Sequence, residues 1–147
     1  MSNGHLAYAI SPYPGQIRVQ PFTDFTTASL TEFLECSAVD SFPFDGDHTL
    51  YFDDEGLQDG IDHYFALAGH TDPLVGKLLI TANHGDRPLL SMREVVLRFN
   101  LFRPVIDPVI KSSRVLRNDL ILFTNTVDRF EARIAQFDIE IVENGDA

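Results

Sequence analysis

The residues best suited to chemistry gather between Asp53 and Asp72. These twenty positions hold carboxylates and imidazoles that could bind a divalent metal or transfer protons, namely Asp53, Asp54, Glu55, Asp59, Asp62, His63, His70 and Asp72. Oxygen and imidazole ligands of this kind hold catalytic metals where they converge on one point. A small metal-dependent hydrolase that uses the acidic cluster from Asp53 to His63 is therefore one functional hypothesis.

The spacing of these residues does not match a metal-binding motif. The turn Asp53-Asp54-Glu55-Gly56 does not start the calcium-loop pattern, and the chain has no His-Glu-x-x-His sequence and no cysteine pair. Gly69 is expected to end a helix between His63 and His70, which would separate the two imidazoles. We therefore expect an exposed acidic turn here, with no metal site and no cofactor.

No catalytic nucleophile with an adjacent base stands out either. Cys36 has Glu35 and Asp40 nearby, and negative neighbours raise the pKa of a thiol, so we expect an inert, half-buried cysteine. The pair His84 and Asp86 lies in a Gly-Pro loop and indicates a turn. The chain also lacks the phosphate-binding glycine loops and the nucleophile elbow of common enzyme families. No catalytic residue is predicted.

The net negative charge lies entirely in the first half of the chain. The formal net charge is −11, and residues 1–72 carry twelve Asp or Glu against Arg18 alone, whereas residues 73–147 carry ten of each sign. Such a field repels nucleic acid and attracts basic protein surfaces. The basic stretch Lys111, Arg114 and Arg117 lacks interleaved aromatics and indicates a salt-bridged surface. Direct nucleic-acid binding is therefore disfavoured.

Length and composition predict one globular domain over residues 1–147. Hydrophobic residues make up 44% of the chain, and twelve Phe with no Trp could fill one core. No apolar run is long enough to cross a membrane, and the first residues lack the pattern of a signal peptide. One cysteine cannot form an internal disulfide, so a reducing cytoplasm is expected.

Local patterns predict strands and short helices in the first half. Residues 6–10 and 16–22 flank a Pro- and Gly-containing turn and predict a hairpin. Ser29 with Glu32 predicts the capping box of a short helix. Residues 49–52 alternate as a half-buried strand, and Ile61, Phe65 and Ala68 recur at helical spacing.

The second half continues with the same mixture. The apolar run 74–81 predicts an interior strand, 105–110 an edge strand and 120–123 a short strand. Residues 127–137 predict a final helix, because Val127, Phe130, Ile134 and Phe137 lie on one helical face, and Ile139 and Ile141 predict a last strand. Strands outnumber helices, which favours an α+β fold with a mixed, mostly antiparallel sheet and about four short helices.

The segment Met92–Phe102 predicts a helix with two apolar sides. Ser91 and Glu94 form its capping box, and Leu97 and Leu101 project opposite the core-facing side as an i,i+4 ridge. A helix that is apolar on two sides is either enclosed in the core or meets another chain. We expect Leu97 and Leu101, flanked by Arg93 and Arg98, to form a subunit contact; the alternative is that the final helix covers the ridge.

Residues 26–102 resemble the DUF3846 family, a domain of unknown function found in bacteria, phages and plasmids. The resemblance rests on a short helix at Ser29–Val39, the strand Leu50–Phe52, the turn 53–56, the alanines of Ala66-Leu67-Ala68 and the strand Val75–Ile80. The family often has Asn-Pro before the alanine, whereas this chain has Asp62-His63-Tyr64-Phe65. The resemblance implies a bacterial or mobile-element setting and no particular reaction.

Three functional hypotheses follow from the sequence. The first is a non-enzymatic acidic protein whose residues Asp53, Asp54, Glu55, Asp59 and Asp62 engage a basic protein partner, with a DNA mimic that inhibits a DNA-binding protein as the extreme form. The second is the metal-dependent hydrolase described above. The third is an oligomerising structural protein without a ligand. The small size of the chain, its acidity and the resemblance to a mobile-element family favour the first.

Overall fold

The chain folds into two units in the computed structural model, which describes residues 4–56 and 61–143. The first unit, here called the body, comprises residues 1–103 and 136–147, and the second, called the ribbon, comprises residues 104–135. The ribbon is made by the distal parts of two long strands, β7 (Phe99–Arg117) and β8 (Leu120–Phe137). A single domain over the whole chain stays a prediction.

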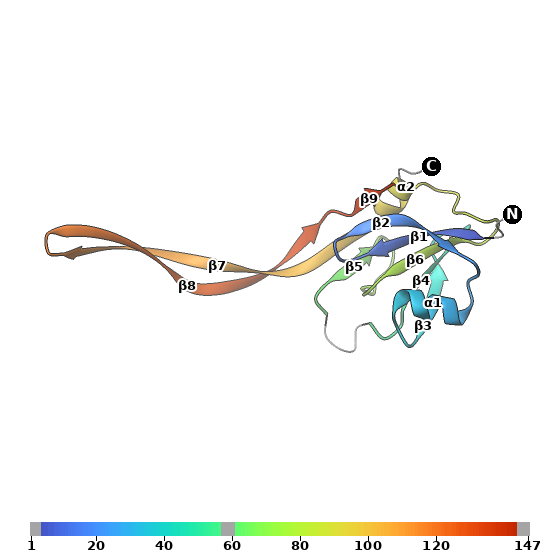
Figure 1. The fold of residues 1–147 in the computed structure, drawn as a ribbon, viewed down its shortest axis with the longest axis horizontal. Helices are drawn as coiled ribbons and strands as arrows, with labels where there is room; N and C mark the ends of the chain where they lie inside the picture. The colour runs from blue at the N-terminus through green and yellow to red at the C-terminus, as the bar shows by residue number, and fades with distance from the viewer. Residues whose placement is uncertain (1–3, 57–60, 144–147) are drawn as a thin grey trace. The chain divides into compact units, whose positions relative to one another are not determined.

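The body is built around a six-stranded sheet with the order β3-β4-β6-β1-β2-β9 (Figure 1). Its strands are β1 (His5–Ser11), β2 (Gln16–Phe22), β3 (Val39–Pro43), β4 (His48–Asp53), β6 (Leu78–Ala82) and β9 (Glu140–Val142). All neighbours are antiparallel except β2 and β9, which are parallel. The predicted mixed, mostly antiparallel sheet and the predicted hairpin β1–β2 are therefore confirmed.

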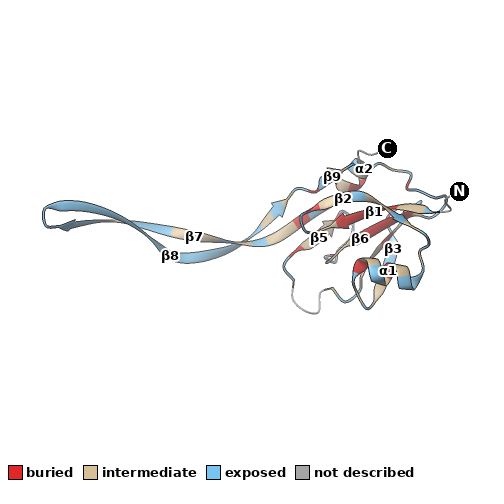
Figure 2. Ribbon diagram, in the orientation of Figure 1, coloured by how far each residue is buried: buried red, intermediate tan, exposed pale blue. Residues whose placement is uncertain are grey.

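The two faces of this sheet carry separate clusters of buried side chains. Figure 2 shows much of β1 and β6 as buried. On one face Ala7, Ala9 and Leu79 pack against Leu30 and Leu34 of helix α1 (Thr27–Leu34). On the other face the partners come from a second sheet of order β5-β7-β8, in which β5 spans Tyr64–Leu67. Because both faces are covered, three of the four buried residues of β6 are apolar and the fourth is Thr81, as expected of the mostly apolar run in its sequence.

Two helices occur in the described part of the chain, fewer than the four that the sequence predicted. Helix α1 begins after Thr26, whose hydroxyl accepts the Ser29 N–H at 3.2 Å, so the capping box predicted at Ser29 and Glu32 is wrong. Helix α2 (Met92–Val96) does have its predicted capping box: Ser91 caps the Glu94 N–H and the Glu94 carboxylate accepts the Ser91 N–H.

The helix predicted around Ile61–Ala68 is wrong, because this segment contains strand β5. Phe65 and Leu67 are buried and alternate with half-buried Tyr64 and Ala66. The strand pairs with the first residues of β7, with Phe65 opposite Leu101. The apolar spacing that suggested a helix is equally satisfied by a strand whose alternate residues face the core.

The helix predicted over Met92–Phe102 is also wrong beyond Val96. Strand β7 starts at Phe99 and pairs with β5, so Leu97 and Leu101 do not form an i,i+4 ridge. Leu101 is fully buried in the core, whereas Leu97 is 77% exposed. Arg98 lies over the ring of Phe44, 4.3 Å from its centroid. A subunit contact that involves Leu97, Arg93 and Arg98 stays a prediction.

The predicted final helix at residues 127–137 is replaced by strand β8. Asn118 and Asp119, both with positive φ, form a two-residue turn that joins β7 to β8. Asn and Asp tolerate this left-handed conformation, and such turns match the twist of a hairpin. The strands predicted at residues 105–110 and 120–123 lie inside β7 and β8. Pairing along the hairpin therefore overrides the helical spacing of Val127, Phe130 and Ile134.

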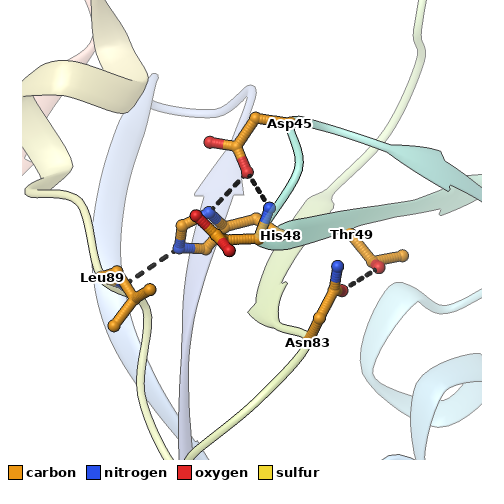
Figure 3. A network of polar contacts seen from close by, with 6 residues as sticks. Asp45, His48, Thr49, Asn83 and Leu89 are labelled. Atoms are coloured by element: carbon orange, nitrogen blue, oxygen red, sulfur yellow. Dashed lines mark hydrogen bonds and ion pairs between the residues drawn. The ribbon is translucent and has the colours of Figure 1, made fainter.

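A buried histidine ties two loops of the body together (Figure 3). His48 is 2% exposed; its Nε2 accepts the Leu89 N–H at 2.9 Å, so Nδ1 carries the proton and donates to the Asp45 carboxylate at 2.8 Å. Partial burial opposes ionisation of Asp45, but hydrogen bonds from His48 and from backbone N–H groups outweigh it and lower the pKa of this carboxyl.

We expect Asp45→Asn to destabilise the fold in a pH-dependent way. Because the folded-state pKa of Asp45 is lowered, its charged form contributes stability that is present above the ordinary carboxyl pKa of about 4 and is lost as the pH falls through the folded value. The variant should lose about 1 kcal/mol of unfolding free energy at pH 7, after allowance for the partial exposure of Asp45. Urea titration should show this difference shrinking below about pH 4. A difference that is constant with pH would contradict the assignment, and Asp47→Asn, at an exposed neighbour, serves as the control.

Candidate functional site: an acidic cleft with an aromatic wall

The body contains a cleft of about 420 Å³ that combines carboxylates with aromatic rings. It lies between the β3–β4 hairpin and the segment that follows β5. The polar and aromatic residues that line it include Asp40, Phe42, Phe52, Asp53, Asp54, His70 and Asp72. Four aspartates from three separate stretches of the chain therefore contribute to one concave surface.

The hairpin register explains how β3 and β4 contribute to the cleft. Asp40 pairs with Phe52 and Val39 pairs with Asp53, so the end of β4 lies beside the start of β3. The acidic turn then leaves the sheet at Asp53, whose carboxylate accepts the Glu55 N–H at 2.9 Å. The Asp54 N–H donates to the Ala38 carbonyl at 3.0 Å. These bonds fix the turn and hold its carboxylates in place.

The acidic turn closes against the opposite wall at Gly56. A Cβ atom built on Gly56 would lie 3.1 Å from Val75 Cβ and 3.2 Å from the Val75 carbonyl oxygen. Such contacts are tighter than most that a Cβ atom makes, and one of them is to a backbone oxygen, so a side chain here would force the turn or Val75 to shift. Glycine therefore favours the close approach of the turn to Val75. Ser37 donates to the Glu55 carboxylate at 2.8 Å on the outside of the same turn.

The aromatic wall of the cleft is formed by stacked rings. The His70 imidazole lies parallel to the Phe42 ring, with centroids 4.3 Å apart and planes 7° apart. Phe42 in turn contacts Phe52, with centroids 5.6 Å apart. Aromatic faces carry partial negative charge and attract cations. The rings therefore add to the preference for cations that the aspartates give the cleft.

The described residues that line the cleft include no Lys or Arg. Among the described residues, no ion pair involves Asp40, Asp53, Asp54 or Asp72. A cluster of like charges repels itself, and a bound cation would relieve that repulsion. The cleft is therefore suited to a positively charged ligand or side chain.

Only part of the predicted acidic surface belongs to the cleft. Asp53 and Asp54 line it, Glu55 lies on the same turn, and Asp59 lies outside the described residues. Asp62 serves a different role: its carboxylate accepts the Nδ1–H of His63 at 2.7 Å, and its carbonyl accepts the Tyr13 hydroxyl at 3.0 Å. The hydrogen bond from His63 is the main reason that the pKa of Asp62 is lowered.

His63 is held by the fold at both ring nitrogens. It is 6% exposed, and its Nε2 accepts the N–H of Gly76 at 2.8 Å while Nδ1 donates to Asp62. Neither nitrogen is free to accept a substrate proton or a metal without losing one of these bonds. The arrangement repeats that of His48, in which a backbone N–H, an imidazole and an Asp carboxylate also form a chain. His63 is thus explained by a structural role.

Two other candidate sites in the described part of the chain are a metal site and a reactive cysteine. Across residues 4–56 and 61–143, no three His, Cys, Asp or Glu side chains are placed to hold a metal ion together. Cys36 is half-buried; desolvation, followed by the charge of Asp53, raises the pKa of its thiol. The raised pKa was predicted, although the sequence suggested Glu35 and Asp40 as its cause.

Sequence reasoning did not assign Asp40, His70 and Asp72 to one surface. Asp40 is separated from Asp72 by more than thirty residues, and only the β3–β4 hairpin and the turn after β5 bring them together. The available signal was the abundance of acidic residues before position 72, which indicated an acidic region but not a concavity.

The fold and the cleft define a sheet-dominated α+β protein with an acidic cleft in its body and a long two-stranded ribbon. No family model matches the chain, and no solved structure is similar to it. The chain is 34% identical over 110 residues to the uncharacterized protein y4iR of Sinorhizobium fredii, covering 71% of this chain and 68% of that protein. The chain therefore belongs to the same family as y4iR.

A second relative is more distant. Protein PsiB of Rhizobium leguminosarum bv. phaseoli is 25% identical over 111 residues, covering 73% of this chain and 83% of PsiB. Both relatives are from rhizobia, which places this family in bacteria. In the described part of the chain, neither helix has the length and hydrophobicity needed to cross a bilayer. The resemblance to DUF3846 stays a prediction.

We expect Gly56→Ala to destabilise the body by about 1–3 kcal/mol, because the added methyl group would push the acidic turn away from Val75. Urea-induced unfolding followed by circular dichroism would measure the loss. Gly46→Ala is the matched control, since a Cβ there meets no atom within 4 Å. Equal stability of the two variants would show that the turn does not depend on its approach to Val75.

Proposed function

We propose that this protein is a non-enzymatic binding protein that engages a basic surface of a partner protein through the acidic cleft. The observation that carries the proposal is that four aspartates and the stacked rings of Phe42 and His70 line one concavity, with no Lys or Arg among its described lining residues. A Lys or Arg side chain that entered the cleft would meet carboxylates at its charged end and ring faces along its stem.

The shape of the cleft favours a protruding side chain over a flat surface. A guanidinium group can pair with carboxylates in two-point contacts and stack on aromatic rings at the same time. The cleft offers both kinds of contact within about 420 Å³. The overall charge of −11 would speed the encounter with a basic partner by long-range attraction. The DNA-mimic form of this hypothesis stays a prediction.

Removal of the cleft charges should weaken the binding of a basic peptide. The probe is a fluorescent peptide that contains several Arg residues, with a Glu-substituted peptide as the negative probe. We expect the triple variant Asp53→Asn, Asp54→Asn, Asp72→Asn to bind the basic peptide at least about tenfold more weakly than the wild type, because each paired charge contributes directly to affinity. Fluorescence anisotropy would measure both affinities.

A matched variant separates the cleft from the general negative field. The control triple variant Asp24→Asn, Glu32→Gln, Asp86→Asn removes the same charge from exposed positions that do not line the cleft. It should bind nearly as the wild type does, and wild-type binding should weaken as salt rises, because surface charges are screened beyond about 8 Å at physiological ionic strength. Equal losses in both triple variants, or an affinity that is flat with salt, would contradict the proposal.

A further inference from the structure

The ribbon exposes most of the large apolar side chains found on the surface of the described chain. Eleven of the fifteen exposed large hydrophobic residues lie between positions 104 and 135. The most exposed are Phe123 at 78% and Leu116 at 72%, next to the turn. A contiguous apolar surface of this kind normally marks an interaction site. Figure 2 shows the ribbon part of β8 as exposed almost throughout and that of β7 as a mixture of exposed and intermediate residues.

The faces of the ribbon near the turn are both apolar. The two-residue turn at Asn118 and Asp119 pairs Leu116 with Ile121, and side chains of paired residues share a face. The contact of the Ser112 hydroxyl with Asn125 Oδ1 at 2.7 Å fits this register. The opposite face then carries Val115, Leu120 and Leu122. An ordinary surface hairpin is apolar on one face only, because that face packs on its own core.

The edges of the ribbon are open as well. Strand β5 pairs with β7 only from Phe99 to Phe102, and β8 is the last strand of its sheet. Beyond Phe102, no described strand of this chain pairs with the outer edge of β7. A two-stranded hairpin is marginally stable in water, and open apolar edges invite a further strand. The ribbon therefore has the properties of a surface that another chain completes.

The charges of the ribbon favour a second ribbon as its partner. The ribbon holds five Lys or Arg and four Asp or Glu, a net charge of +1, so the other residues carry −12. Two ribbons of mixed charge can meet without strong repulsion, whereas two bodies repel each other. A strongly acidic body also opposes approach to an anionic membrane, even though Lys111, Arg114 and Arg117 are close to the apolar turn.

The apolar area of the ribbon is large enough for a stable dimer. If a fully exposed large apolar residue presents on the order of 200 Å², the eleven residues present roughly 1,300 Å² in each copy, and the face that carries Leu116, Ile121 and Phe123 presents roughly 750 Å² of it. A standard protein interface buries about 800 Å² per partner, polar atoms included. One face of the ribbon therefore supplies an apolar area comparable to that of a standard interface.

We propose that the ribbon is a dimerisation arm, which packs against the ribbon of a second copy of this chain. The interface is isologous, because the same residues of both copies meet about a two-fold axis. This inference is independent of the acidic cleft. It assigns the self-association that the sequence suggested to Leu116, Ile121 and Phe123 of the ribbon instead of to Leu97.

Sedimentation equilibrium of the full chain tests the proposal. The wild type should sediment as a dimer, and the double variant Leu116→Ser, Phe123→Ser should have a dimer dissociation constant raised at least about a hundredfold, because two exposed anchors are lost from each copy. Leu89→Ser, which changes a similarly exposed leucine of the body, is the matched control and should remain dimeric. Far-UV circular dichroism and an unchanged urea unfolding midpoint would show that the variant body is folded.

Cysteine cross-linking locates the contact independently. In a Cys36→Ser background, the ribbon variant Asn125→Cys should form an interchain disulfide or a short bis-maleimide cross-link, whereas Asp24→Cys in the body should not. A monomeric wild type would overturn the proposal, as would loss of the dimer in a Leu97→Ser variant but not in the ribbon variant. Binding of the monomer to phosphatidylserine vesicles through Leu116 and Phe123 would overturn it in favour of a membrane contact.

Discussion

The structure of the body depends on the burial of both faces of its central strand, β6. Leu78 and Ile80 pack against the second sheet, while Leu79 packs against the cluster beneath α1, and all three are fully buried. A strand that is buried on both faces is stabilised by both covering layers, namely helix α1 on one side and the sheet that contains β5 and β7 on the other. Strand β6 also supports the cleft, because β4, which carries part of the cleft lining, pairs directly with it.

Two histidines, in different parts of the body, accept hydrogen bonds from backbone N–H groups. Loops that cross a packed core leave backbone N–H groups away from water, and an unpaired buried N–H is costly. His48 satisfies the Leu89 N–H and His63 satisfies the Gly76 N–H, and each ring passes its other hydrogen to an Asp carboxylate at the surface. This use of imidazole explains why a chain with an acidic cluster and nearby histidines need not be a metal enzyme.

The body and the ribbon bury their apolar residues to different extents. In the body, large side chains fill two clusters, and only Tyr13, Ile61, Leu89 and Leu97 are exposed large hydrophobics among its described residues. In the ribbon, large apolar residues remain on the surface of two strands that have no covering layer within the unit. The same chain thus combines a completed core with an apolar surface that is suited to another molecule, while the acidic cleft offers a separate, charged surface.

Local sequence determined those features whose causes lie within a few residues. The β1–β2 hairpin, the capping box of Ser91 and Glu94, and the tight acidic turn at Gly56 follow from turn and cap chemistry, and the buried strand β6 follows from its continuous apolar run. Local sequence also fixed the imbalance of charge between the two halves. It could not place Asp40, Asp53 and Asp72 around one cleft, because that proximity depends on the pairing of β3 with β4.

Tertiary structure decided the segments whose apolar spacing suits either a helix or a strand. Phe65 and Leu67, the residues from Leu97 to Phe102, and Val127 to Phe137 can each present an apolar face in both conformations. Strand β7 makes all three segments strands, because it contains the second segment and pairs with the first, in β5, on one side and with the third, in β8, on the other. The physical reason is that a strand gains its hydrogen bonds from a distant partner, so its stability cannot be seen in its own residues.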